Sequence, residues 1–162
     1  MRPRLALVTS GAEPERLTDE ERAQWFAFAH VLTLLPGVLE TQMQRDGGIG
    51  HFDYLVMSWL STAPERTLRM SELASSVCGT LSRLSNAATR LERQGWLTRR
   101  PNPEDGRATL VTLTDAGRQK VESVAPAHEA ELRRLFFEPL TAAQSRQLAT
   151  ACRRILAVAQ ES

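Results

Sequence analysis

The stretch 80–93 carries residues whose types and spacing suit hydrogen bonding to nucleic acid. Thr80 predicts a helix start, because its side chain can accept a backbone N–H at the N-cap. Gly95 predicts the helix end, because a residue in the left-handed conformation commonly follows the last turn. Between them, short hydroxyl and amide side chains are mixed with arginines, the groups that read base edges and bind phosphates in a major groove. The candidate DNA-binding residues of this helix are Thr80, Ser82, Arg83, Ser85, Asn86 and Arg90.

The residues after this helix predict a two-stranded hairpin. A short strand is expected over 97–100, a turn over 101–106 and a returning strand over 107–113. Residues 80–107 contain six arginines and three acidic residues, a net charge of +3, whereas the whole chain has a net charge of +1. A helix followed by a basic hairpin predicts a winged helix-turn-helix, with the helix in the major groove and the wing in the minor groove or on the backbone. The inward face of the returning strand is predicted to consist of Thr109, Val111 and Leu113.

Apolar spacing indicates the elements that hold this helix and hairpin. A strand is expected over 67–70, and a second amphipathic helix over 52–60. Ser71 is predicted to cap a scaffold helix ending near Val77 and to lie close to DNA phosphates. The stripe that should bury the recognition helix consists of Leu81, Leu84, Ala88 and Leu91.

Longer helices are predicted on both sides of this unit. Thr18 and Glu21 form a capping box, and Thr141 and Gln144 form a second one. Pro36 and Pro126 should kink their helices, and Pro36 could mark a break. The first and last helices have apolar stripes with nothing else evident in the chain to bury against, so a second copy is the expected partner. Cys152 lies on such a stripe and is predicted to be in the core.

Composition excludes several classes of protein. No apolar run reaches 18 residues, so no membrane span is expected. The N-terminal apolar stretch is too short for a signal peptide, and two distant cysteines predict no disulfide framework, which favours a cytoplasmic protein. The spacing of the three histidines predicts no metal site, no cofactor is expected, and no catalytic or phosphate-loop motif is present, which argues against an enzyme.

The segment that follows Thr80 and Leu81 resembles the DNA-binding core of the MarR family of transcriptional regulators. It reads SRLSNAATRLERQGWLTRRPNPEDGRATLVTLTDAGR, and the order of predicted elements fits the family over residues 18–160. Many members have Asp-Arg-Arg in the wing, where this chain has Asp105, Gly106 and Arg107. The resemblance implies that Asp105 orients Arg107 into the minor groove; a surface ion pair is the alternative. Arg99 completes the candidate wing residues.

The resemblance also implies the domain organisation and a fold that is mainly α-helical with a small β-hairpin wing. In the family, the first and last helices of two subunits form the dimer. The expected parts are a loose arm (1–17), an N-terminal dimerisation helix (18–46), a winged helix-turn-helix DNA-binding domain (51–113, with the recognition helix at about 80–94 and the wing at about 97–113) and C-terminal dimerisation helices (114–160).

Family members bind small aromatic or phenolic ligands between the dimer helices and the winged domain. Urate-responding members pair a tryptophan and an aspartate with two arginines; here Leu32 and Ala87 stand where the arginines would be, which argues against urate. Cys78 precedes the recognition helix, where a thiol pKa can be lowered, so redox sensing is a further alternative. The candidate pocket consists of Trp25, Phe28, His51, Phe52, Asp53 and Trp59, with a structural core as the competing interpretation for its tryptophans and Phe52.

These features predict a homodimeric, ligand-responsive transcriptional repressor that binds a pseudo-palindromic operator and associates with the nucleoid. A winged-helix protein-interaction module without sequence-specific DNA binding is the alternative. The excess of arginine over apolar residues on the helix and wing favours DNA.

Overall fold

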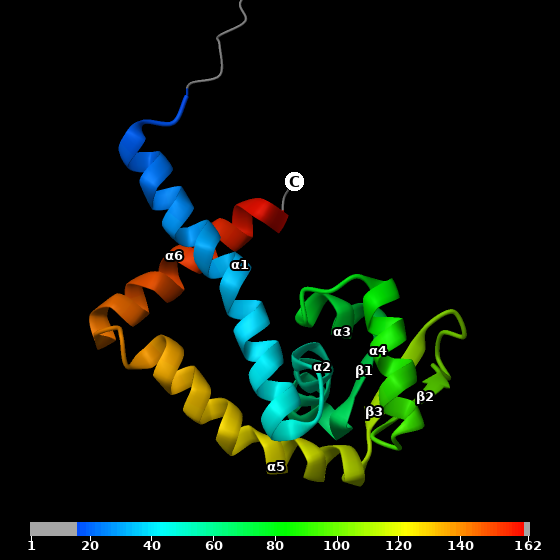
Figure 1. Ribbon diagram of the computed structural model, residues 1–162. Coiled ribbons are helices and arrows are strands. Elements are labelled where there is room, and N and C mark those ends of the chain that lie inside the picture. The colour runs from blue at the N-terminus through cyan, green and yellow to red at the C-terminus, as the bar shows by residue number, and fades with distance from the viewer. Residues whose placement is uncertain (1–15, 161–162) are drawn as a thin grey trace, which may run out of the picture. The chain divides into compact units, whose positions relative to one another are not determined.

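The structure is a computed structural model that describes residues 16–160. The expected N-terminal arm, 1–17, lies almost wholly outside the described residues. The chain is mainly α-helical with one small antiparallel sheet, as predicted (Figure 1). The helices are α1 (Asp19–Gly47), α2 (His51–Thr62), α3 (Met70–Ser76), α4 (Leu81–Arg93), α5 (Asp115–Leu132) and α6 (Ala142–Gln160), with short η1 (Pro64–Arg66) and a π-helical turn η2 (Arg133–Phe137); the strands are β1 (Thr67–Arg69), β2 (Leu97–Pro101) and β3 (Thr109–Leu113).

Helix α1 begins at the predicted capping box. The Thr18 backbone N–H donates to Glu21 Oε2 at 2.8 Å, and the Glu21 N–H donates to Thr18 Oγ1 at 3.2 Å. The helix continues through Pro36, so a break there was a wrong expectation. A proline removes a single backbone hydrogen bond, and the intact turns on both sides keep the helix continuous. The described chain divides into two compact units between Leu35 and Pro36.

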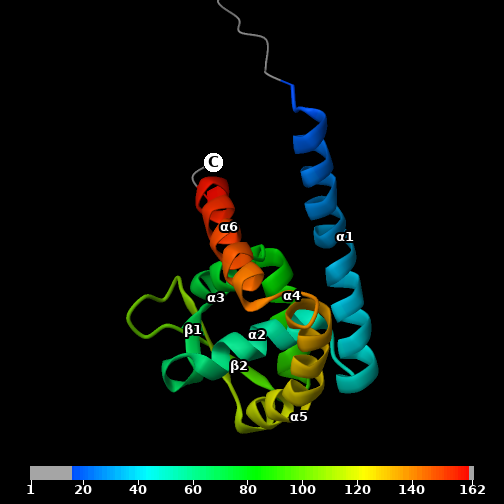
Figure 2. The ribbon, with the colours of Figure 1, turned by 90° about the vertical axis from the view of Figure 1, so that its left-hand side faces the viewer.

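The unit that begins at Pro36 contains the winged helix-turn-helix. Its sheet has the order β1-β3-β2, so β3 is central and β2 is an edge strand. The β2–β3 hairpin projects beyond the helices in both views of the ribbon (Figures 1 and 2). Val111 and Leu113 are buried as predicted, whereas Thr109 is exposed. Thr109 pairs with Pro101 at the far end of the hairpin, beyond the helices that cover the sheet.

The core of this unit lies between the sheet and helices α2 to α5. Leu84, Ala88 and Leu91 of α4 are buried as predicted, together with Ala87. Leu81 is instead 56% exposed. At about 100° per residue, Leu81 lies roughly 70° from the centre of the buried stripe, so it falls at its edge. The largest fully buried side chains are Met43, Met57, Leu60, Leu73, Leu84, Leu91, Leu97 and Leu113.

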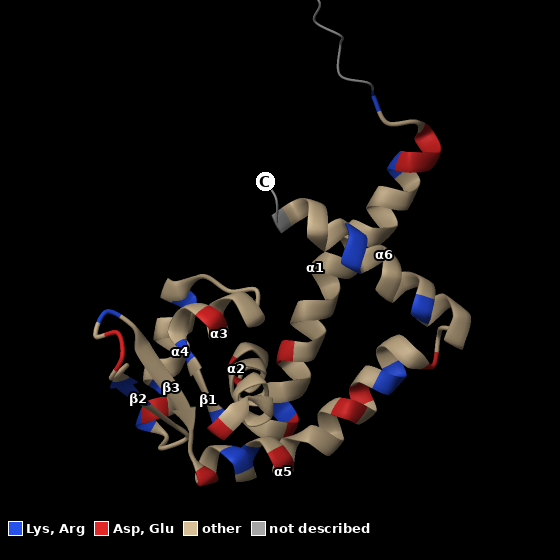
Figure 3. Cartoon of the chain, turned by 180° about the vertical axis from the view of Figure 1, so that it is seen from behind, with Lys and Arg blue, Asp and Glu red and all other residues tan. Residues whose placement is uncertain are grey.

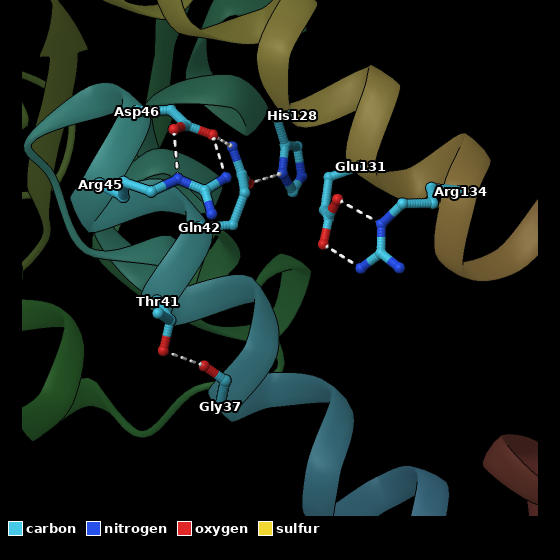
Figure 4. A network of polar contacts seen from close by, with 8 residues as sticks. All are labelled: Gly37, Thr41, Gln42, Arg45, Asp46, His128, Glu131 and Arg134. Atoms are coloured by element: carbon cyan, nitrogen blue, oxygen red, sulfur yellow. Dashed lines mark hydrogen bonds and ion pairs between the residues drawn. The ribbon is translucent and has the colours of Figure 1, made fainter.

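A polar network joins the C-terminal half of α1 to α5 (Figure 4). Gln42 is buried, donates to Asp46 Oδ2 at 3.0 Å and contacts His128 Nδ1 through its carbonyl oxygen at 3.2 Å. The pKa of Asp46 is lowered to about 2, first by the hydrogen bond from Arg45 and then by that from Gln42. Because the Gln42 amide nitrogen is used on Asp46, His128 Nδ1 is assigned as the donor to its oxygen.

The C-terminal helices also begin where the sequence predicts. Thr114 Oγ1 accepts the Gly117 N–H at 3.0 Å, and Thr141 and Gln144 form the second capping box. Helix α5 continues through Pro126 and, with η2, ends at Phe137. Cys152 is half-buried, so the prediction that it lies in the core was wrong for the single chain. No helix within residues 16–160 is both long and apolar enough to cross a membrane.

Candidate nucleic-acid interface

The recognition helix α4 is fixed at both ends by the residues that predicted its bounds. Thr80 is the N-cap, and its Oγ1 accepts the Arg83 N–H at 3.2 Å. Gly95 follows the last turn with φ +73°, in the left-handed region. The Trp96 N–H then bonds to the Leu91 carbonyl at 3.0 Å, which closes the helix end and directs the chain into β2.

The face of α4 opposite its buried stripe is exposed and polar. At about 100° per residue, Ser82, Asn86 and Arg93 lie within roughly 40° of one another on this outward face. All three are exposed, as is the neighbouring Ser85. Arg93 forms no ion pair within residues 16–160, so its guanidinium is available to solvent or a phosphate. The outward face therefore presents hydroxyls, an amide and one unpaired cation.

Arg83 and Arg90 lie on one flank of α4, away from the centre of the outward face. The Arg83 guanidinium carbon stands 4.0 Å from the centre of the Phe52 ring. Arg90 forms a two-point ion pair with Asp53 of α2, with Nη2–Oδ1 at 2.6 Å and Nε–Oδ2 at 3.3 Å. Both arginines were predicted on the DNA-facing surface. The structure places them where α4 meets α2, with side chains engaged by the protein.

This flank borders a cleft of about 710 Å³. His51, Phe52 and Asp53 line it, as the sequence predicted for a pocket. Trp59 does not line it and is 47% exposed, so its place in a ligand pocket stays a prediction. Phe52 and Trp59 lie on nearly the same side of α2, but seven residues separate them by about 10 Å along the helix axis, so Phe52 lines the cleft and Trp59 does not. The cleft is lined by Pro36, Gly37, Glu40, Gln44, Gly50, His51, Phe52, Asp53, Arg83, Asn86 and Arg90.

Glu40 is a cleft residue that the sequence did not reveal. Its Oε2 accepts the His51 backbone N–H at 2.8 Å, at the start of α2. Burial is the main cause that lowers the pKa of His51, with the neighbouring His128 next. Trp25 and Phe28, the other predicted pocket residues, belong to the N-terminal unit, where their ring centres are 6.1 Å apart.

The other flank of α4 is bonded to the wing. Arg99 of β2 donates to Glu92 Oε2 from Nε at 3.1 Å and from Nη2 at 2.7 Å. The same Nη2 donates to Thr89 Oγ1 at 3.2 Å, and the Arg99 backbone N–H donates to Glu92 Oε1 at 3.1 Å. The hydrogen bonds from Arg99 lower the pKa of Glu92. Arg99, predicted as a DNA contact, is thus bound within the protein.

The wing turn is built around Asn102, which the sequence did not single out. Asn102 is buried, its Oδ1 accepts the Glu104 N–H at 3.1 Å, and its carbonyl accepts the Asp105 N–H at 3.2 Å. Asp105 Oδ1 accepts the Arg107 backbone N–H at 3.2 Å and forms no ion pair with the guanidinium. Asp105 was expected to orient the Arg107 side chain. An aspartate bonds readily to the N–H two residues on, and here that contact shapes the backbone.

The remaining predicted residues, Ser71 and Cys78, precede α4 in the chain. Ser71 is exposed in the first turn of α3 and is not its cap. The N-cap of α3 is Arg69, whose N–H donates to Glu72 Oε2 at 3.1 Å, because Glu72 can reach back across one turn. Cys78 is exposed and has φ +50° in the turn before Thr80. Within residues 16–160, no group of three His, Cys, Asp or Glu side chains could hold a metal ion.

The charge on this surface is less positive than the sequence suggests. Of the six arginines in residues 80–107, Arg90 and Arg99 are neutralised by Asp53 and Glu92. Acidic and basic segments both occur along the wing (Figure 3). The other four arginines of this segment form no ion pair within residues 16–160; they are Arg83, Arg93, Arg100 and Arg107.

Comparison with known proteins fits this geometry. The sequence model described as the MarR family matches residues 52–109, which span α2 to the start of β3. The transcriptional repressor IacR of Pseudomonas putida is 33% identical over 153 residues, which cover 86% of this chain and 88% of IacR. The chain belongs to the MarR family. It is therefore a DNA-binding transcriptional regulator and not an enzyme.

Two MarR-family structures from Streptomyces coelicolor extend the likeness to the fold. Sco3205, solved in complex with DNA, has a TM-score of 0.85 at 38% identity and covers 88% of this chain and 90% of its own. AbsC has a TM-score of 0.85 at 31% identity and covers 91% of this chain and 99% of its own. The MarR fold thus includes the helices outside the winged unit.

Proposed function

We propose that this MarR-family protein is a homodimeric repressor that binds a pseudo-palindromic operator and is released by a small anionic ligand. The observation that carries the proposal is the outward face of α4, where Ser82, Asn86 and Arg93 are exposed together. Amide, hydroxyl and guanidinium groups on one helix face are suited to base edges and phosphates in a major groove.

The DNA contacts divide into two kinds. Ser82, Ser85 and Asn86 read base edges, because they lie in the first half of the helix, the part that usually contacts bases. Unpaired arginines bind phosphates, with Arg93 on the helix and Arg107 at the wing. Ser71, at the start of α3, and Thr80, at the start of α4, lie near the DNA backbone. Thr80 acts mainly as the cap of α4.

Dimerisation is supported by the large apolar side chains exposed on the terminal helices. Soluble monomers rarely expose contiguous apolar patches of more than a few hundred Å². A second copy of the chain would cover these side chains. The two recognition helices would then enter successive major grooves about 34 Å apart, so the operator is pseudo-palindromic. The exposed residues are Trp25, Phe26, Val31, Leu32 and Leu34 of α1 and Ile155 and Leu156 of α6.

Ligand release is supported by the position of the cleft beside α4. Arg83 and Arg90 line it, and Arg90 is held there by Asp53. An aromatic acid could stack on Phe52 and compete with Asp53 for Arg90. Such a ligand lowers DNA affinity only if it binds the DNA-free conformation more tightly than the DNA-bound one. IacR is a transcriptional repressor, which supports repression as the direction of regulation.

Selection of genomic DNA fragments by the purified protein tests the operator. We expect enrichment of a pseudo-palindrome whose half-sites are about 10 base pairs apart, and light scattering should give the mass of two chains of 18.0 kDa. Absence of any enriched sequence would favour the protein-interaction alternative. If a monomer bound a single half-site, sequence-specific DNA binding would be retained and the proposed homodimer would be contradicted.

Ligand release needs its own test. Small aromatic carboxylic acids are screened for release of the protein from the selected operator. Arg90→Met should retain DNA binding and lose the response to any active acid, whereas Trp59→Phe, outside the cleft, should retain both. If an aromatic acid released Arg90→Met and wild type from the operator equally, the ligand would bind somewhere other than this cleft.

A further inference from the structure

The bonds between α4 and β2 form a compact unit, here named the α4–β2 clamp and consisting of Thr89, Glu92 and Arg99. One carboxylate accepts three hydrogen bonds from a single residue, two from the Arg99 guanidinium and one from its backbone N–H. Thr89 accepts a further bond from the same guanidinium at 3.2 Å. The side chains of Arg99 and Glu92 are 27% and 37% exposed.

The backbone bond is the most informative part of the clamp. In the sheet order β1-β3-β2, β2 is an edge strand, so alternate N–H groups on its outer side have no strand partner. Glu92 satisfies one of them, at Arg99, across the gap to the helix. A surface ion pair that merely balanced charge would not require this backbone contact. The clamp therefore fixes the position of the strand itself relative to α4.

We propose that Glu92 and Arg99 are positioning residues for DNA binding, which set the spacing between the recognition helix and the wing, and that Arg99 is not a phosphate contact. The inference rests on the DNA-binding role proposed above. It assigns a function to Glu92. The negative charge of this residue, on a DNA-binding helix, by itself disfavours the binding of DNA, which is a polyanion.

A contact at Arg99 controls the position of the wing tip, because the hairpin beyond it acts as a lever. The hairpin continues from Arg99 to Asn102 before it turns, a distance of about 10 Å at roughly 3.3 Å per residue. A swing of about 15° at Arg99 would displace the turn by about 3 Å. That displacement equals the length of a hydrogen bond, which spans roughly 2.7–3.2 Å. Without the clamp, Arg107 of the wing and the outward face of α4 could not contact the same DNA at the same time.

The two roles of Arg99 give opposite signs for one substitution. Glu92→Gln removes the carboxylate and frees the Arg99 guanidinium. If Arg99 contacted a phosphate, this variant would bind DNA more tightly, because a cation is released and a negative charge is lost near the DNA. If the clamp positions the wing, the variant binds operator more weakly in spite of the gain in positive charge.

The experiment measures dissociation constants on the selected operator and on scrambled DNA, across a salt series, for wild type, Glu92→Gln, Arg99→Gln and the double variant. We expect each single variant to lose about tenfold affinity for the operator, and the double variant to lose no more than either, as for residues in one contact network. The loss on scrambled DNA should be smaller, and the salt slope of Glu92→Gln should not fall. Glu104→Gln is the charge-matched control in the wing, and its operator affinity should not decrease.

Each outcome decides the inference. Tighter binding by Glu92→Gln, or a salt slope lower by about one for Arg99→Gln alone, would assign Arg99 to the phosphate backbone and overturn the clamp. Thermal unfolding of each variant shows whether it is folded; for an unfolded variant, Glu92→Asp and Arg99→Lys replace it, and partial recovery of operator affinity is expected. Failure of wild type to prefer operator over scrambled DNA would overturn the proposed function and the clamp with it, whereas preference by wild type with unchanged Glu92→Gln binding would overturn the clamp alone.

Discussion

The two flanks of the recognition helix are each held by one arginine–carboxylate pair, with the charges reversed. On the cleft flank, α4 supplies Arg90 and α2 supplies Asp53, at 2.6 Å. On the wing flank, α4 supplies Glu92 and β2 supplies Arg99, at 2.7 Å. The first pair borders a cleft of about 710 Å³, and the second also binds a backbone N–H of the strand.

This difference separates a contact that a ligand can replace from one that it cannot. Asp53 and Arg90 meet only through side chains, so an anion in the cleft can take the place of the carboxylate. Glu92 also satisfies a main-chain donor of an edge strand, and its loss would leave that group to water. In the proposed function, the cleft flank is therefore where a ligand would act on α4, and the wing flank is where the geometry is fixed.

The largest effect is expected on the outward face between the two flanks. Asn86→Ala should reduce the preference for operator over scrambled DNA by about 1–3 kcal/mol, because an amide that bonds a base edge is lost. Anisotropy titrations on both DNAs measure the ratio, and Gln119→Ala, at an exposed position of α5, is the control. An equal loss on both DNAs would mean that Asn86 contacts the backbone.

Packing at the base of the wing should come next. A Cβ at Gly117 would lie 2.3 Å from the Trp96 carbonyl oxygen, so Gly117→Ala should lower the free energy of unfolding by about 1–3 kcal/mol. Gly37 in α1 has nothing within 4 Å of the corresponding position, and Gly37→Ala should be neutral or stabilising by up to about 1 kcal/mol. Urea unfolding compares the two, and equal stabilities would refute this account of the wing base.

A smaller effect is expected on the cleft flank. Asp53→Asn releases Arg90 and removes a negative charge near the DNA, so operator affinity should rise a few-fold at low salt, with a change in unfolding free energy below about 1 kcal/mol. This is the same chemical change as Glu92→Gln with the opposite predicted sign. Weaker binding by Asp53→Asn would make the two flanks equivalent and remove the distinction between them.

The smallest effect concerns two neighbouring histidines, His51 in the cleft and His128 beside it, with ring centres 5.4 Å apart. Burial is the main cause that lowers the pKa of both His51 and His128 below their ordinary value of 6.5. Their neutral forms are favoured in the fold, so the associated stability is complete above about pH 6.5 and is lost as the pH falls toward the lowered values. Between pH 7.5 and 6.0, His128 should account for at most about 0.8 kcal/mol of this loss. Urea unfolding of His128→Gln at both pH values should show a smaller pH dependence than wild type; an unchanged dependence would exclude His128.

Sequence reasoning was most successful where local chemistry decides the structure. Thr80 and Gly95 predicted the ends of α4, and the capping boxes at Thr18 and Thr141 predicted two further helix starts. Each of these depends on side chains within a few residues of one another. The hairpin was likewise predicted from its alternation and its turn residues.

The partners of the arginines depend on contacts between elements and were not predictable. The sequence counts Arg90 and Arg99 as positive charges, but it does not show that Asp53, 37 residues earlier, and Glu92, on a different element, neutralise them. Asn102 was predictable in principle, since asparagine and proline are both turn residues and Asn102 stands between two prolines. Leu81 was assigned to the core because apolar spacing does not show where the packed stripe ends.

The central claim, that α4 and the wing read a specific DNA sequence, is tested most directly by fluorescence anisotropy of the purified protein. The DNA upstream of its own gene is compared with a scrambled fragment across a salt series. The account predicts tight binding to the upstream fragment, weak binding to the scrambled one, and a log–log salt slope that is steeply negative on both. Equal affinity for the two fragments, repeated with sequences from the genomic selection, would contradict it.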